Sequence, residues 1–269
     1  MNEDSFHSTD QGLENLAIDP DVLAKELAAE LQGDPLDDIA VEGLDSDKNK
    51  VLKECQLGLK WLQQGHEERL QGLRVFCEHR DPRALALLIP LLSEPCAVER
   101  MSAVYALGRN PSPEAVTILL ELLDKDSNAY VRKAAAWSLG NYSDFPVMEP
   151  LIKSLHNDIA AVRLWAASSL AEIGSISLQN AQDVVTELLL SLQIDQEPLV
   201  RSNCIWSLGR LYENLLDPLK EKLIEGLFLI LLNDIEPSVR YESRIALEQI
   251  QDPDIEIRLK NLLEEGLLL

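Results

Sequence analysis

The chain has 269 residues and a formal net charge of −22 at pH 7. A surface with this charge repels nucleic acids and anionic membranes, so neither is expected as a partner. The sequence has no run of about twenty apolar residues that could span a bilayer. Its N-terminus lacks the basic and apolar regions of a signal peptide. Four cysteines without close spacing make a reducing, cytoplasmic environment the simplest expectation.

The first segment, residues 1–49, is predicted to be an acidic and mostly disordered arm. The first 50 residues contain fourteen Asp or Glu and three Lys, which is too much charge for a core. One short helix is expected near residues 20–31, because an Asp-Pro pair can start it and three leucines share one face, Leu23, Leu27 and Leu31. This helix either docks on a partner or on the rest of the chain, or forms only transiently.

A recurring motif follows the arm. The stretch YVRKAAAWSLG begins at Tyr130, and the nearly identical LVRSNCIWSLG begins at Leu199. Weaker copies align with these two, and the arginines of the series are 31, 32, 31, 38 and 39 residues apart: Arg69, Arg100, Arg132, Arg163, Arg201 and Arg240. A period of this length is typical of a solenoid, in which no unit can bury its apolar face alone.

Each unit is predicted to be a helical hairpin. A Leu-rich first helix begins near a proline, as in residues 113–123 and 146–155, and the Arg-Ala-Leu motif forms the second helix. Residues 50–269 should therefore form a repeat domain of six hairpins and a closing helix at 254–264. We expect the glycines that follow the motif to adopt positive φ at helix ends: Gly108, Gly140 and Gly209.

An acidic residue precedes most of these arginines by five or six positions. Stacking would place each carboxylate near the guanidinium of its own or of an adjacent unit, in a ladder along the molecule. A planar guanidinium with five donors suits such bridging better than a lysine does. The sequence therefore predicts a structural role for the repeated arginines. The acids are Glu94, Asp126, Asp158, Asp195 and Asp234.

The pattern Asp-x-x-x-x-Val-Arg-x-x-Ala-x-x-x-Leu-Gly resembles HEAT repeats, and among them the HEAT-like repeats of cyanobacterial phycobilin lyases. The resemblance covers roughly residues 50–269, and with the repeat pattern it leads us to expect an all-α, right-handed α-solenoid. Residues 135–140 and 204–209 are similar to the Ala-Ala-Trp-Trp-Leu-Gly segment of E/F-type lyase subunits, which attach or detach bilins on phycobiliproteins. Ser138 and Ser207 stand where that segment has its second Trp. A related cyanobacterial HEAT protein partners an A-type iron–sulfur carrier.

The sequence has no phosphate loop, zinc-finger spacing or nucleophile elbow. No metal or cofactor is predicted. Cys204 falls on a buried position of its helix, and Cys77 and Cys96 should lie at opposite ends of stacked helices. Cys55 and Cys77 are expected to reach one rim of the first unit, where two thiols would be half of a cluster and a partner would have to supply the rest.

Three aromatic residues occupy one equivalent position in different units: Tyr105, Trp137 and Trp206. They are predicted to line a partner-binding surface, and the alternative is that they only pack between units. The favoured function is a non-catalytic scaffold, an assembly or maturation factor that holds another protein on its concave face. The resemblance implies an iron–sulfur carrier as that partner. The alternative is a phycobilin lyase or isomerase subunit that acts on phycobiliproteins, so whether the chain is an enzyme stays open.

Overall fold

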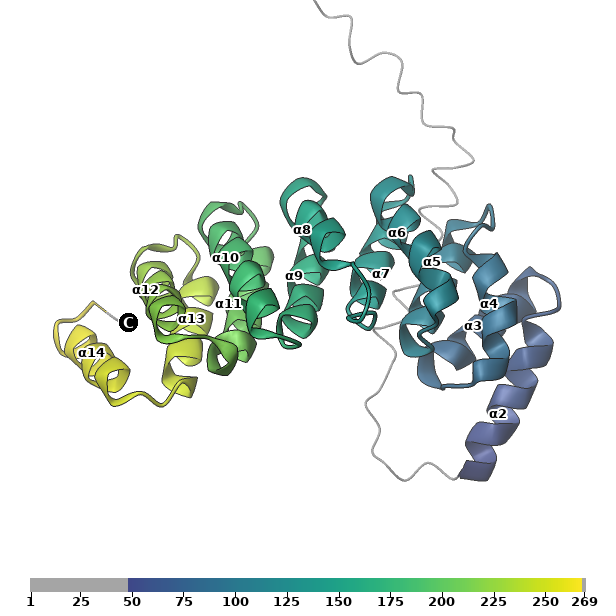
Figure 1. The fold of residues 1–269 in the computed structure, drawn as a ribbon, viewed down its shortest axis with the longest axis horizontal. Coiled ribbons are helices and arrows are strands. Elements are labelled where there is room, and N and C mark those ends of the chain that lie inside the picture. The colour runs from purple at the N-terminus through teal and green to yellow at the C-terminus, as the bar shows by residue number, and fades with distance from the viewer. Residues whose placement is uncertain (1–47, 268–269) are drawn as a thin grey trace, which may run out of the picture.

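The computed structural model describes residues 48–267, which form helices and connecting turns with no strand among them (Figure 1). The predicted all-α solenoid of helical hairpins is confirmed. The predicted arm and its helix near residues 20–31 lie outside the described residues, except that residues 48 and 49 already belong to the first helix of the repeat array. The predicted boundary between arm and repeat domain stays a prediction.

Six hairpins follow one another through the described part of the chain, and a single helix follows the last of them. In chain order the hairpins are α2 (Lys48–Trp61) with α3 (His66–Glu78), α4 (Leu85–Leu91) with α5 (Ala97–Arg109), α6 (Val116–Lys125) with α7 (Ala129–Leu139), α8 (Met148–Asn157) with α9 (Ala160–Gly174), α10 (Leu178–Ile194) with α11 (Pro198–Leu211), and α12 (Asp217–Asn233) with α13 (Pro237–Gln249). The closing helix is α14 (Pro253–Glu264).

The second helices of the hairpins form the inner layer of the array. Each of them packs along the second helices of both neighbouring units, whereas the first helices of neighbouring units touch far less. The array therefore curves toward its second helices, which lie on the concave side of the arch (Figure 1). Alanine makes this close approach possible, because the motif places fully buried alanines such as Ala135, Ala136 and Ala167 between helices.

Gly108 and Gly140 serve close packing between second helices. A Cβ atom at Gly108 would lie 2.4 Å from the Trp137 ring, and one at Gly140 would lie 2.8 Å from Ser169 Oγ. The prediction of positive φ at the motif glycines is wrong, since only Gly266 among the described glycines has it. The helices α5 and α11 instead continue through their glycines, and in α11 a Cβ atom at Gly209 would meet no other atom within 4 Å.

The two serines that replace the second Trp of the lyase-like segment are fully buried. Ser207 Oγ donates to the carbonyl oxygen of Ala167 on the preceding second helix at 3.0 Å. Ser138 Oγ would lie only 3.1 Å from a Cβ at Gly108, so the helices are too close here for a larger side chain. A second Trp in the lyase-like segment would therefore not fit this stack.

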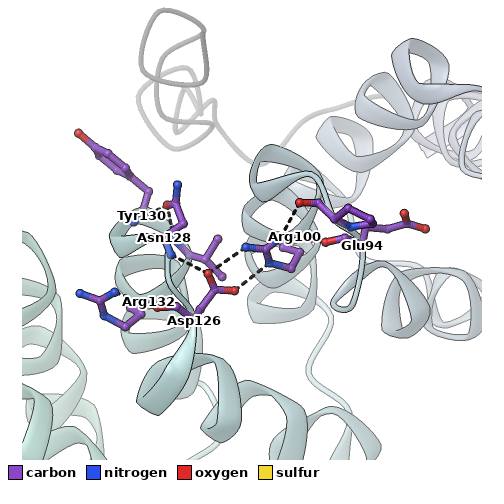
Figure 2. A network of polar contacts seen from close by, with 8 residues as sticks. Glu94, Arg100, Asp126, Asn128, Tyr130 and Arg132 are labelled. Atoms are coloured by element: carbon purple, nitrogen blue, oxygen red, sulfur yellow. Dashed lines mark hydrogen bonds and ion pairs between the residues drawn. The ribbon is translucent and has the colours of Figure 1, made fainter. Parts of the chain in front are cut away.

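The predicted ladder is present, and it runs between units. In Figure 2, the guanidinium of Arg100 faces the carboxylate of Asp126, with Nε and Nη2 donating at 2.8 and 2.9 Å. The same two-pronged contact joins three further pairs: Arg132–Asp158, Arg163–Asp195 and Arg201–Asp234.

Each of these arginines also donates from Nη1 to a carbonyl oxygen in the turn before its own helix. Arg132, for example, donates to the carbonyl oxygen of Asp126 at 2.9 Å. One arginine thus connects its own turn with the turn of the next unit. The first arginine of the series, Arg69, pairs with two glutamates, Glu94 and Glu99, instead of with an aspartate.

A candidate protein-binding face

The open side of the inner layer is best defined on α9. Other helices cover its remaining sides, because α7, α8, α10 and α11 all pack against it. The side chains of α9 that keep solvent exposure recur at helical spacing on one face: Ala161, Leu164, Trp165, Ser168 and Glu172. We call this side, together with the equivalent sides of α7, α11 and α13, the concave face.

Trp206 lies exposed on the concave face. It belongs to α11, and 51% of its surface is accessible, which is high for a tryptophan. The guanidinium of Arg210 lies over its ring, 4.8 Å from the centroid. Arg210 is itself held by Glu172 of α9, with Nη2 donating to Oε2 at 3.1 Å. Arg210 therefore makes a cation–π contact with the ring, and about half of the surface of Trp206 stays open to solvent.

Trp137 and Tyr105 contact each other but differ in exposure. Their rings meet edge to face, with centroids 5.4 Å apart and an interplanar angle of 67°. Trp137 is half-buried, and Arg109 lies 5.9 Å from its ring centroid. Tyr105 is fully buried. The structure thus brings two of the three predicted residues together and leaves Trp206 two units further along the array.

The unit between Trp137 and Trp206 has a polar contact in place of an aromatic ring. Asn203 Nδ2 of α11 donates to Ser168 Oγ at 2.8 Å and to the carbonyl oxygen of Leu164 at 3.0 Å. This amide joins α9 to α11 on the concave face. The small serine is needed here because the asparagine side chain fills the position that a large residue would occupy.

Further apolar residues on the concave face were not predicted from the sequence, among them Leu199, Tyr241 and Trp165. Leu199 and Tyr241 are 71% and 62% exposed, and Trp165 is half-buried. Leu199 lies on the same helical face as Trp206, seven residues earlier. None of the three shares the motif position of Trp137 and Trp206. An alignment of every position around the repeated arginine, rather than of that position alone, would have found them.

Three of the four cysteines lie in the core, whereas Cys96 is partly exposed. Cys55, Cys77 and Cys204 are at most 3% exposed, and all three belong to the hydrophobic core cluster. Burial raises the pKa of the Cys55 thiol, and it raises the pKa of Cys204 far more strongly. The expected rim position of Cys55 and Cys77 is therefore wrong, because α2 and α3 turn both thiols inward. Among residues 48–267, no group of three or more His, Cys, Asp or Glu side chains is placed to hold a metal ion.

Within the same range of residues, no helix has both the length and the apolar composition needed to cross a bilayer.

Comparisons with known proteins agree with the geometry. A family model described as HEAT repeats matches residues 59–140, and one described as HEAT repeat matches residues 185–215. A designed armadillo repeat protein in complex with peptide (KR)4 is similar in structure, with a TM-score of 0.50, 21% identity, and coverage of 75% of this chain and 91% of that chain.

Kap121p is similar with a TM-score of 0.56 and 16% identity, over 85% of this chain and 28% of that chain. This chain thus corresponds to little more than a quarter of Kap121p. None of the curated proteins matches the sequence. Matches at these identities bear on the fold, and with the family models they show a HEAT- or armadillo-like repeat protein.

Proposed function

We propose that the chain is a non-catalytic protein-binding scaffold and that its concave face holds a segment of another protein. The observation that carries the proposal is the exposed ring of Trp206, which contacts Arg210, the partner of Glu172 in an ion pair between α11 and α9. Tryptophan is enriched among binding hot spots, and an exposed ring offers a partner a large apolar contact surface.

The surroundings of Trp206 support the same interpretation. Leu199, two turns earlier on α11, and Tyr241, on the neighbouring helix α13, add exposed apolar surface. Carboxylates lie close to both of them in the chain, because Glu197 is two residues before Leu199 and Glu242 directly follows Tyr241. We therefore propose a partner segment with an apolar anchor side chain and flanking Lys or Arg. Trp137, whose ring contacts that of Tyr105, extends the predicted partner-binding surface toward the N-terminal units.

The role of an assembly or maturation factor follows from the resemblance to cyanobacterial HEAT-like proteins, one of which partners an A-type iron–sulfur carrier. A scaffold that presents the client protein, without a cofactor of its own, suits the buried cysteines. Their thiols must lose a proton to bind iron, and burial makes this costly.

The test uses the full chain as bait in an extract of its native cell. Wild type, Trp206→Ala and Leu229→Ala are compared, because Leu229 is equally exposed at 50% but belongs to a first helix, α12. The expected result is a specific protein that is retained by wild type and by Leu229→Ala and lost with Trp206→Ala. Equal retention by all three baits would refute the concave-face assignment.

The alternative, a phycobilin lyase or isomerase subunit, makes a separate prediction. Such a subunit binds a tetrapyrrole, so the chain produced together with bilin synthesis would carry a visible absorbance band. The scaffold hypothesis expects no band above that of a Trp206→Ala control. Anaerobic purification and an ultraviolet–visible spectrum test the iron–sulfur cluster in the same way.

A further inference from the structure

The N-terminal end of the array has a different charge from the rest of the molecule. Residues 48–91 contain eight Lys or Arg against five Asp or Glu, whereas residues 92–267 contain fifteen against twenty-seven. The excess of positive charge is therefore confined to the first hairpin and the start of the second. It lies directly after residues 1–47, which hold fourteen acidic residues and one lysine.

The outer face of α2 concentrates this positive charge. Lys53 and Lys60 are exposed in the middle of the face that points away from α3, and Lys48 is exposed at the start of the helix. None of these three ammonium groups has an ion-pair partner among residues 48–267. The one acid of the helix, Glu54, lies to the side of this face, where its carboxylate accepts from His79 Nε2 at 2.9 Å and lies 3.9 Å from Lys50 Nζ.

The same face also exposes apolar surface. Leu57 is 42% exposed on this face, and Leu52, which is 49% exposed, lies on its flank. The first helices of later hairpins have a preceding unit beside them, whereas α2 begins the described array (Figure 1). The open side of a terminal solenoid unit is normally polar, so exposed leucine there favours a cover. A suitable cover for α2 combines apolar side chains with carboxylates.

We propose that the acidic segment within residues 1–47 of the same chain covers the outer face of α2. Its leucine stripe, Leu23, Leu27 and Leu31, provides the apolar side chains for Leu52 and Leu57. The surrounding carboxylates provide the charge for the lysines. This inference concerns the end of the array and is independent of the partner proposed for the concave face.

The chain is long enough to make this contact. Residues 32–47 connect the leucine stripe to Lys48, and sixteen extended residues span about 50 Å. The helix α2 has 14 residues and is about 21 Å long, so every point of its outer face is within reach. Closing so short a loop costs little entropy compared with recruiting a separate molecule.

Zero-length carbodiimide coupling of the full chain tests the proposal, because this reagent joins a lysine only to a carboxylate that touches it. Coupling of each lysine to peptides of residues 1–47 is measured by mass spectrometry and divided by its coupling to added acetate. We expect this normalised coupling to be at least fivefold higher for Lys53 and Lys60 than for Lys125 and Lys222. The controls are matched, because Lys125 and Lys222 are also exposed and form no ion pair with the described residues.

Two further arms make the result decisive. Coupling at Lys53 should fall at least threefold in 1 M NaCl, because salt at this concentration screens charges that are more than about 3 Å apart. It should also fall at least threefold in the variant Lys60→Glu, but not in the control variant Lys125→Glu. An equimolar mixture of ¹⁴N and ¹⁵N protein should give products of one isotope only. Equal normalised coupling at all four lysines overturns the proposal. Mixed-isotope products also overturn it, because they assign the cover to a second copy.

Discussion

Arg201 and Asp234 join two consecutive hairpins by a two-pronged ion pair that is almost out of contact with solvent. Arg201 Nε and Nη2 each donate to one oxygen of the carboxylate at 2.7 Å, and the side chains are 7% and 4% exposed. The third nitrogen, Nη1, donates to the carbonyl oxygen of Asp195 at 2.9 Å. Loss of the guanidinium would leave the buried Asp234 carboxylate with the backbone N–H of Glu236 but without a charged donor.

The ladder predicts a difference between internal and terminal arginines. Arg163→Ala should lower the free energy of unfolding by about 2 kcal/mol, since Asp195 remains buried and loses its charged donor. Arg240→Ala should cost less than about 1 kcal/mol, because Arg240 donates only to the carbonyl oxygen of Asp234. Urea unfolding of both variants measures the difference. Equal losses at the two sites would show that the ladder contributes no stability.

The ladder also predicts acid sensitivity. Burial acts to raise the pKa of Asp195, but hydrogen bonds from Arg163 and from the turn outweigh it and hold that pKa below the ordinary value. The same holds for Asp158 and Asp234. An aspartate with a lowered folded-state pKa binds more protons when unfolded. Its contribution to stability is therefore complete above the unfolded pKa of about 4 and is lost as the pH falls through the folded pKa.

Urea midpoints measured from pH 7 down to pH 2.5 check this sign. We expect the aspartates of the ladder to change the urea midpoint little above pH 5, and we expect the midpoint to fall steeply below about pH 4. Asp195→Asn should be less stable at pH 7 and should show a shallower loss toward low pH. An acid dependence identical to wild type in that variant would contradict the assignment.

Glycine substitutions should act in opposite directions at equivalent motif positions. Gly108→Ala should destabilise by about 1–3 kcal/mol, because its Cβ would lie 2.4 Å from the Trp137 ring. Gly209→Ala should stabilise by about 0.5–1 kcal/mol, because α11 is helical there and nothing lies within 4 Å of the new methyl group. Thermal and urea unfolding of both variants test the pair. Stabilisation at both positions would refute the close packing at Gly108.

Alanine substitution of the two motif tryptophans should have different effects: one should weaken partner binding and the other should lower stability. Trp206→Ala should reduce partner binding by about 2 kcal/mol and leave stability within about 1 kcal/mol of wild type, since the ring is half exposed. Trp137→Ala should cost about 2–3 kcal/mol of folding free energy, because its ring packs on Tyr105 and over Gly108. Melting and affinity are measured on each variant. A Trp206→Ala protein that folds and binds normally would remove Trp206 from the binding face.

The period of the repeated arginine and the spacing of Leu and Ala along one helical face determined the fold from the sequence alone. Both signals are local, because a helical hairpin of about thirty residues buries its apolar stripe against the next copy of itself. The sequence also predicted an arginine–aspartate ladder. It left open whether each arginine pairs within its own unit or with a neighbour.

Only the tertiary structure decided how neighbouring units cover equivalent residues. Tyr105 and Trp206 share one motif position, yet Tyr105 is fully buried and Trp206 is half exposed. Gly108 and Gly209 share another, yet only Gly108 faces a ring. A repeated motif fixes the direction in which a side chain leaves its own helix. What that side chain meets depends on the distance and the residues of the next helix, and these differ from one unit to the next.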